Sequence, residues 1–564
     1  MSPGQHPRTS FLYRQMVDKP IADPAPRAAS SGFPPLQHAS RSRRATVLHV
    51  TLAGTIGALN TLAFAPTPHG GWLELAIFAC AFWLVSRTRT LRGALLTGGA
   101  FGFGQFVSGV WWLYVSMHCY GDMPALMAGA AVVLFSLYLA LYPAFSAGLW
   151  HLCRAPRGQC ATFTPSWHAS VAFACAWTLG EWLRGTVFTG FPWLASGYAQ
   201  VDGPLAGFAP LVGVYGVGWV LALVGALIIQ AAMRIGEGRG VVTWLVPAAV
   251  ASGLLVCGML LARVTWTQPS GPALWVRLLQ GNVEQSMKFD PVGIRHAIAQ
   301  YQQLITEKPA DLVVTPETAI PLLLYEAPPE FGTAVRRFVD ATHTSVLFGA
   351  VGATMTENGP KDLTNALYGI TPGSSGLYRY DKHHLVPFGE FIPWGFRWFV
   401  DMMKMPLGDF SRGGSIQPPF IVHGQSIAPN ICYEDIFGEE IARTLRSQSP
   451  PASVLVNSTN LGWFGNTIAL DQHLQMARMR ALETGRPMLR ATNTGATAMI
   501  DAHGSVKAQL RRFTVGALDV RVRGRSGMTP YIVAGNLTVL VISLVGLALG
   551  FGMGRRASAG RACE

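Results

Sequence analysis

Apolar residues are concentrated in eight long runs, seven of them before residue 263 and one near the C-terminus. The runs cover approximately residues 45–64, 72–86, 93–116, 124–151, 168–183, 205–232, 241–262 and 530–552. A helix needs about 20 mostly apolar residues to cross a bilayer, and most of the runs reach or approach that length. The pattern therefore predicts a bundle of about eight transmembrane helices, in which the second and fifth are the shortest.

Basic residues lie in alternate links between these runs. The links 65–71 and 118–124 contain no Lys or Arg. The other links and flanks carry Arg41, Arg43, Arg44, Arg87, Arg89, Arg92, Arg154, Arg157, Arg234, Arg239, Arg555 and Arg556. Basic links stay on the cytoplasmic side of a membrane, so the alternation orients the whole bundle. It predicts a multi-pass protein of the bacterial inner membrane, with residues 264–526 in the periplasm.

Composition and charge agree with this membrane assignment. Half of the residues are apolar and 13% are charged, against a usual charged share of about a quarter. The formal charge of +13 comes largely from the links and the two terminal tails, so it indicates membrane orientation and not nucleic-acid binding. The eight cysteines match neither zinc-site nor disulfide spacing. We therefore predict no metal site and no cofactor.

The long segment between the seventh and eighth runs differs in pattern from the rest. Short β-branched stretches such as 274–280, 345–350 and 427–431 alternate with helical patterns such as 291–307 and 471–484. This alternation is typical of a single α/β domain. The predicted division is a disordered basic tail (1–44), seven helices (45–263), the α/β domain (264–526), an eighth helix (527–554) and a second tail (555–564).

The link at residues 184–204 is rich in aromatic residues. Phe188, Phe191, Trp193 and Tyr198 follow one another within it. Aromatic side chains favour the level of the lipid headgroups, so this link is interpreted either as an interfacial anchor or as a portal for substrate. The sequence leaves both interpretations open.

Three residues of the α/β segment suggest an activated thiol. Cys432, the only cysteine of that segment, follows a strand-like stretch in Asn-Ile-Cys-Tyr-Glu. Glu317 follows a buried strand pattern in Thr-Pro-Glu-Thr, where a carboxylate can act as a general base. Lys382, in Tyr-Asp-Lys-His-His, can stabilise an oxyanion. Each residue alone has an ordinary structural interpretation; the combination predicts acyl transfer through a thioester.

These motifs, with Asp-Lys-x-x-Leu-Val-Pro-Phe-Gly-Glu, resemble the nitrilase (carbon–nitrogen hydrolase) superfamily. That resemblance implies an α-β-β-α sandwich with a Glu–Lys–Cys triad. The eight apolar runs narrow the resemblance to the apolipoprotein N-acyltransferase family. Further matching stretches are Glu181-Trp-Leu-Arg-Gly, Phe191-Pro-Trp and the segment from His473 to Glu483.

The resemblance implies a two-step acyl transfer that needs no cofactor. The Cys432 thiolate would take a fatty acyl chain from a phospholipid, through the sn-1 ester of phosphatidylethanolamine. The N-terminal amine of a diacylglyceryl-cysteine on an apolipoprotein would then accept the chain. The alternative is a membrane-tethered amidase that uses the same triad and passes the acyl group to water.

The resemblance also implies a set of supporting residues and reveals two departures from the family pattern. The supporting set comprises Glu390, Tyr433, Glu434, Asn365, Phe289 and Trp394. Phe289 stands where family members often have Trp, and Leu461 where they often have Asp. Trp394 begins an amphipathic stretch, 394–405, which is interpreted either as a core-packing helix or as an arm that enters the outer leaflet.

Overall fold

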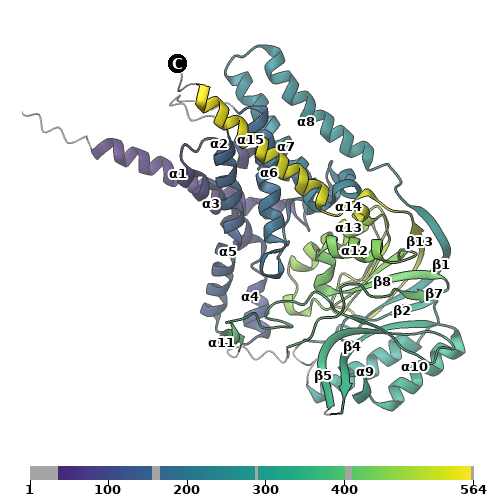
Figure 1. Ribbon diagram of the computed structural model, residues 1–564. Helices are drawn as coiled ribbons and strands as arrows, with labels where there is room; N and C mark the ends of the chain where they lie inside the picture. Colours follow the sequence, from purple (N-terminus) through teal and green to yellow (C-terminus); the bar gives the residue numbers. More distant parts are fainter. Residues whose placement is uncertain are drawn as a thin grey trace, which may run out of the picture. The chain divides into compact units, whose positions relative to one another are not determined.

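The computed structural model describes residues 36–154, 165–285, 287, 290–357, 359–400 and 409–560. Each of the eight apolar runs contains a long helix (Figure 1). These helices are α1 (Leu36–Asn60), α2 (Gly70–Ser86), α3 (Leu91–Gly109), α5 (Ala125–Cys153), α6 (Trp167–Arg184), α7 (Ala209–Gly236), α8 (Val241–Leu261) and α15 (Leu537–Gly560).

Four helical segments of the described residues are long and apolar enough to cross a membrane. They are Thr46–Ala63, Ala125–Cys153, Ala206–Gly236 and Val241–Leu261. Two more, Gly70–Ser86 and Leu537–Gly552, are apolar but shorter. By length and composition the structure therefore supports four spans, and the count of eight stays a prediction.

The helix ends differ from the predicted tails. Helix α1 begins at Leu36, inside the stretch 1–44 that was expected to be disordered, and α15 continues to Gly560. Both extensions contain Ala and Arg, which favour helix, and neither contains proline. Polarity alone therefore placed the helix ends too close to the apolar runs.

Two sheets form the α/β domain. The first has the strand order β13-β1-β2-β4-β5-β6, with β3 paired to β4, and the second has the order β12-β11-β10-β9-β8-β7. The strands of the first are β1 (Gln268–Gln280), β2 (Leu312–Val314), β3 (Ile320–Leu323), β4 (Ser345–Thr356), β5 (Gly359–Ile370), β6 (Tyr378–Asp381) and β13 (Gly516–Ser526). The second contains β7 (Phe420–Val422), β8 (Gln425–Ile431), β9 (Val454–Thr459), β10 (Met488–Thr492), β11 (Ala498–Ile500) and β12 (Val506–Gln509).

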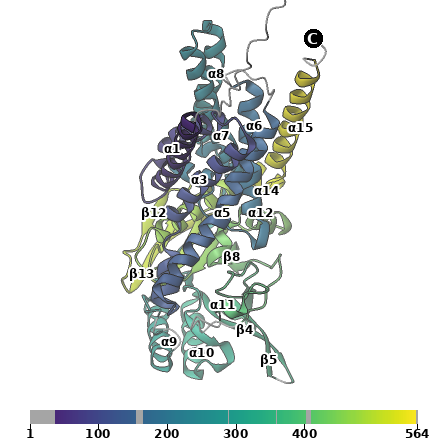
Figure 2. The same cartoon turned by 90° about the vertical axis from the view of Figure 1, so that its left-hand side faces the viewer.

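The sheets pack face to face, and helices cover their outer faces. Leu278 and Leu347 of the first sheet share a buried core with Ile427 and Val456 of the second. Helices α9 (Pro291–Thr306) and α10 (Pro329–Thr342) cover the first sheet, whereas α12 (Gly438–Ser447) and α13 (Ala469–Thr484) cover the second. Figures 1 and 2 show α9 and α10 side by side, on the opposite side of the sheets from α12. The predicted α-β-β-α sandwich is confirmed.

The central strands of both sheets are parallel, and their carboxyl ends meet. Strand β2 pairs with β1 and β4 in parallel, and β9 pairs in parallel with β8 and β10. The Ser458 hydroxyl, near the end of β9, donates to the carbonyl of Thr315, which follows β2, at 3.0 Å. Loop residues that follow β2, β8 and β9 therefore lie at one edge of the sandwich, as ligand sites do in α/β folds.

The aromatic link 184–204 packs against the α/β domain. Trp193 and Tyr198 are at most 2% exposed, while Phe188 is 82% exposed. Trp193 Nε1 donates to Gln472 Oε1 of α13 at 2.7 Å, and the Tyr198 hydroxyl donates to the Ile436 carbonyl at 2.9 Å. The interpretation as an interfacial anchor therefore fits Phe188 and is wrong for Trp193 and Tyr198, because protein partners satisfy their polar tips.

Helix α13 is buried on nearly all sides between the sheet and the helices. Besides Gln472, its Glu483 accepts from the Val214 amide of α7 at 2.7 Å, and Arg478 pairs with Asp202 at 2.5 Å. Direct polar contacts of this kind restrict the freedom of the domain. The domain is therefore docked on the helices and is not merely tethered to them.

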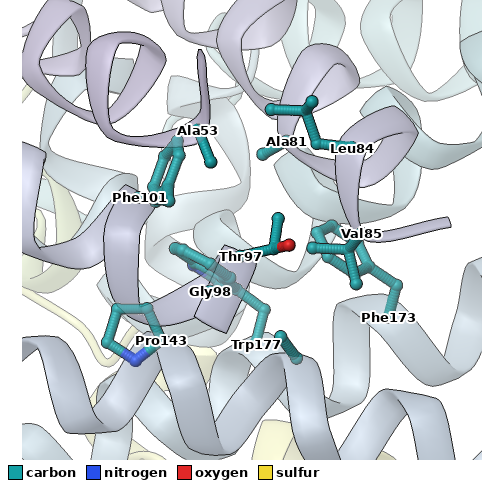
Figure 3. Close-up of a pocket in the computed structure, with 11 residues that line it drawn as sticks. Ala53, Ala81, Leu84, Val85, Thr97, Gly98, Phe101, Pro143, Phe173 and Trp177 are labelled. Atoms are coloured by element: carbon teal, nitrogen blue, oxygen red, sulfur yellow. The ribbon is translucent and has the colours of Figure 1, made fainter. Parts of the chain in front are cut away.

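A small apolar pocket lies among α1, α2, α3, α5 and α6 (Figure 3). Phe101, Pro143, Phe173 and Trp177 line it, and Thr97 contributes a hydroxyl. None of its lining residues belongs to the α/β domain. The pocket is therefore separate from the site formed by Glu317, Lys382 and Cys432.

Candidate active site

Glu317 lies three residues after β2, at the edge where the parallel strands end. Its side chain is 7% exposed. Oε2 accepts a hydrogen bond from the Asn460 backbone amide at 2.9 Å, and Oε1 accepts one from Asn365 Nδ2 at 2.6 Å. These donors fix the orientation of the carboxylate before any substrate arrives.

Lys382 follows β6 and lies between two carboxylates. Its ammonium is 2.9 Å from Glu390 Oε1 and 3.4 Å from Glu317 Oε1. Burial alone would lower the pKa of Lys382, but the carboxylates of Glu390 and Glu317 outweigh burial and raise it. Lys382 therefore remains a cation at physiological pH, inside a buried site where its charge is poorly screened.

Asn365, on β5, bridges the same two carboxylates from another direction. Its Nδ2 donates to Glu317 Oε1 at 2.6 Å and to Glu390 Oε1 at 2.7 Å. Glu390 Oε2 in turn accepts from the Val386 amide at 2.8 Å. Asn365 and Lys382 thus hold the Glu317 and Glu390 carboxylates closer together than the repulsion between two negative charges would otherwise allow.

Cys432 lies where β8 ends and a short 3₁₀ turn, Cys432–Ile436, begins. Its backbone is left-handed, with φ of 51°, a conformation that costs a residue with a side chain about 1 kcal/mol. Burial and the nearby Glu317 carboxylate raise the pKa of the Cys432 thiol to about 12. Lys382 and Thr459 act in the opposite direction. The resting group is therefore a neutral thiol, which needs a base to become a nucleophile.

Glu434 braces the turn that carries Cys432. One carboxylate oxygen accepts from the His383 and His384 amides at 2.7 and 3.2 Å. The other accepts from the Ile431 amide at 2.6 Å and from the Tyr380 hydroxyl at 2.9 Å. The predicted supporting residue is thus a structural clamp between the segment after Lys382 and the turn after β8.

We expect Glu434→Gln to destabilise the protein. The glutamine amide has the shape of the carboxylate, but its NH2 group would face backbone N–H donors. We therefore expect the free energy of unfolding to fall by about 3 kcal/mol. Unfolding in mixed detergent micelles measures the loss. Glu440→Gln is the control, because the Glu440 carboxylate is partly exposed and contacts a side chain, His384 Nδ1, at 2.8 Å. Equal stability of the two variants would contradict the role as a clamp.

The remaining predicted residues have different surroundings. The Tyr433 hydroxyl donates to the Gly190 carbonyl in the link at 3.0 Å, so its side chain connects the turn to the helices. Trp394 is 98% exposed. The short helix α11 (Arg397–Val400) follows it. Phe289 and the last part of the amphipathic stretch, residues 401–405, lie outside the described residues.

Asn460 and Gln285 also belong to the site, although neither was predicted there. The Asn460 backbone holds Glu317, and its Nδ2 donates to Gln285 Oε1 at 2.8 Å. The neighbouring Leu461, a departure from the family pattern, is 1% exposed and packs inside. The sequence signal that could have identified Asn460 is its position directly after strand β9, whose carboxyl end lies at the same edge as Cys432.

The fold and the site define a carbon–nitrogen hydrolase domain joined to apolar helices, and the comparisons with known proteins agree. The carbon–nitrogen hydrolase model matches residues 275–528, and the model of the apolipoprotein N-acyltransferase N-terminal domain matches residues 56–227. The chain belongs to the apolipoprotein N-acyltransferase family.

Relatives of that family match nearly the whole chain. The apolipoprotein N-acyltransferase of Ralstonia nicotianae is 52% identical, over 97% of this chain and 100% of its own length. That of Nitrosomonas europaea is 43% identical, over 88% of this chain and 95% of its own. Among solved structures, a carbon–nitrogen hydrolase superfamily protein from Xanthomonas campestris is similar with a TM-score of 0.34 at 18% identity, covering 45% of this chain and 91% of its own.

Proposed function

We propose that this protein transfers a fatty acyl chain from a phospholipid to the N-terminal amine of a diacylglyceryl-cysteine, through a thioester on Cys432. The observation that carries the proposal is the arrangement of a fixed carboxylate, a buried cation and a strained, protonated thiol at one sheet edge. Family membership supports the lipoprotein acceptor. The donor is proposed to be phosphatidylethanolamine, cleaved at its sn-1 ester.

In the first step Glu317 removes the thiol proton while the sulfur attacks the ester carbonyl. The tetrahedral intermediate carries a negative oxygen, which the Lys382 ammonium and the Tyr433 backbone N–H stabilise. The C–O bond then breaks, and Glu317 returns the proton to the departing oxygen of the lysophospholipid. Glu317 is ionised again, and Cys432 holds the acyl chain as a thioester.

In the second step the neutral acceptor amine attacks the thioester carbonyl. Glu317 takes a proton from the attacking nitrogen, the C–S bond breaks, and the sulfur recovers that proton. Glu390 and Asn365 keep Glu317 and Lys382 in place during both steps. An ester donor is activated enough for this exchange, so the reaction needs no cofactor.

We propose that the apolar helices hold this chemistry beside lipid. We propose that the basic links lie in the cytoplasm and the α/β domain in the periplasm, where the lipoprotein N-terminus is accessible. The direct contacts of α13 and Tyr433 with the helices and the link support a site that receives lipid substrates from the side of the membrane.

We expect acyl transfer to require a free amine on the acceptor. With phospholipid vesicles present, a diacylated lipopeptide with a free N-terminus should gain one acyl chain, and the same lipopeptide with an acetylated N-terminus should gain none, because its nitrogen is not nucleophilic. Mass spectrometry of the lipopeptides measures both. Release of free fatty acid at an equal rate with either lipopeptide would instead indicate the amidase-like alternative, in which water is the acceptor.

A further inference from the structure

Three buried side chains, outside the groups used above, form a charged cluster next to the turn that begins with Cys432. Asp435 lies in the turn that begins with Cys432, His473 lies on α13 and Arg490 lies on β10. Arg490 Nη1 donates to Asp435 Oδ2 at 3.0 Å and to the His473 carbonyl at 3.2 Å. Arg490 Nη2 is 2.9 Å from His473 Nδ1, and His473 Nε2 is 3.2 Å from Asp435 Oδ1.

The donor chemistry of arginine fixes the charges in this cluster. A guanidinium only donates, so His473 Nδ1 must accept and the ring is neutral. Burial and the neighbouring Arg490 lower the pKa of His473, in agreement with a neutral ring. Burial raises the pKa of Asp435 to about 7, against the opposing effect of Arg490. Of the three groups, Arg490 is therefore the one that stays charged throughout the neutral pH range.

The thiol turn is connected to the aromatic link 184–204 at two points, the first of them through His473 of the cluster. The His473 ring lies 5.7 Å from the Trp193 ring of the link, and the adjacent Gln472 accepts from Trp193 at 2.7 Å. At the far end of the turn, the Ile436 carbonyl accepts from Tyr198 at 2.9 Å and from Arg480 at 3.1 Å. A strained residue persists only where its surroundings determine its conformation, and these contacts hold the far end of the turn that Cys432 begins.

We infer that Arg490 is a positioning residue for Cys432. Through Asp435 it fixes the turn that holds the thiol in its left-handed conformation, and through His473 it joins that turn to α13 and the aromatic link. It also places a positive charge close enough to Cys432 for the two groups to interact electrostatically. Arg490 touches no substrate; it acts through the turn.

The test compares two fully buried arginines that lie four residues apart. Arg486 donates to the Ala452 carbonyl at 2.8 Å and to the Gly527 carbonyl at 2.7 Å, and neither acceptor belongs to the thiol turn. Arg490→Met and Arg486→Met thus each remove a buried arginine. The first readout is the rate of iodoacetamide alkylation at Cys432, followed by peptide mass spectrometry at fixed pH. The second readout is the rate of Cys432 acylation by phospholipid.

We expect Arg490→Met to slow alkylation about tenfold and acylation about a hundredfold, because small displacements of a reacting group are costly. Arg486→Met should stay within about twofold on both readouts. If the Met variants do not fold, Arg490→Lys and Arg486→Lys replace them; Lys keeps the charge but cannot make the same paired contacts. An approximately threefold loss in alkylation is then expected for Arg490→Lys alone.

Equal rates for an Arg490 variant and its Arg486 counterpart would overturn the inference. The inference rests on the proposed function, because positioning of Cys432 matters only if Cys432 is the nucleophile. Alkylation by iodoacetamide nevertheless probes the thiol without any acyl donor. A wild-type protein that is alkylated but never acylated would therefore contradict the proposed function and still test Arg490.

Discussion

Replacing Glu317 with Gln is expected to slow acylation of Cys432 by about a thousandfold at pH 7, within the usual range for loss of a general base. Glutamine keeps the shape of the side chain and its contact with the Asn460 amide, but it cannot take the thiol proton. Burial alone still raises the pKa of the Cys432 thiol above its ordinary value in this variant. The remaining activity should therefore come from the small fraction of Cys432 that ionises without a base.

The pH dependence distinguishes loss of the base from loss of structure. Below its pKa a thiol yields about ten times more thiolate for each pH unit gained, so acylation by Glu317→Gln should rise about tenfold per unit from pH 7 to 9. The wild type should change little over that range. Glu330→Gln, on α10, is the control. A Glu317→Gln variant with the flat profile of the wild type would contradict the role as a base.

Replacing Lys382 with Met should remove acylation and also destabilise the protein. Glu317 Oε1 and Glu390 Oε1 share the donors of Lys382 and Asn365. Without the cation, two buried carboxylates face each other, and loss of one partner in such a pair costs about 3–5 kcal/mol. Unfolding in mixed micelles and acylation of Cys432 measure the two effects separately.

A second substitution separates stability from chemistry. In Lys382→Met combined with Glu390→Gln, one of the two negative charges is gone, so much of the lost stability should return. Acylation should not return, because the cation that stabilises the oxyanion is still missing. A double variant that recovers acylation would show that Lys382 acts only by neutralising Glu390.

The sequence predicted the parts of this fold in which residues of one kind follow a regular period. The strands around 274–280 and 427–431 and the helices at 438–447 and 471–484 lie within elements of the structure. The edge strand β13 was missed because the strand prediction relied on short stretches dense in β-branched residues. In β13, buried Val520 and Val522 instead alternate with exposed Arg521 and Arg523, so half of the strand is polar.

The site was predicted from motifs, and its internal connections were not. The structure brings Glu317, Lys382, Glu390 and Asn365 into direct contact, with Cys432 nearby. No pattern within one segment shows that the Asn460 amide, more than a hundred residues later, holds the Glu317 carboxylate. The burial of Trp193 and Tyr198 was missed for the same reason: their partners, Gln472 and Ile436, lie far away in the sequence, in the α/β domain.

The location of the acyl chain between the two steps tests the account most directly. Wild-type protein and Cys432→Ala would be incubated with phospholipid vesicles without acceptor, digested and mapped by mass spectrometry. The account predicts a fatty-acyl mass on the wild-type peptide that contains Cys432, its loss when a free-amine lipopeptide is added, and no transfer by Cys432→Ala. Transfer to the lipopeptide by Cys432→Ala at the wild-type rate would contradict the account.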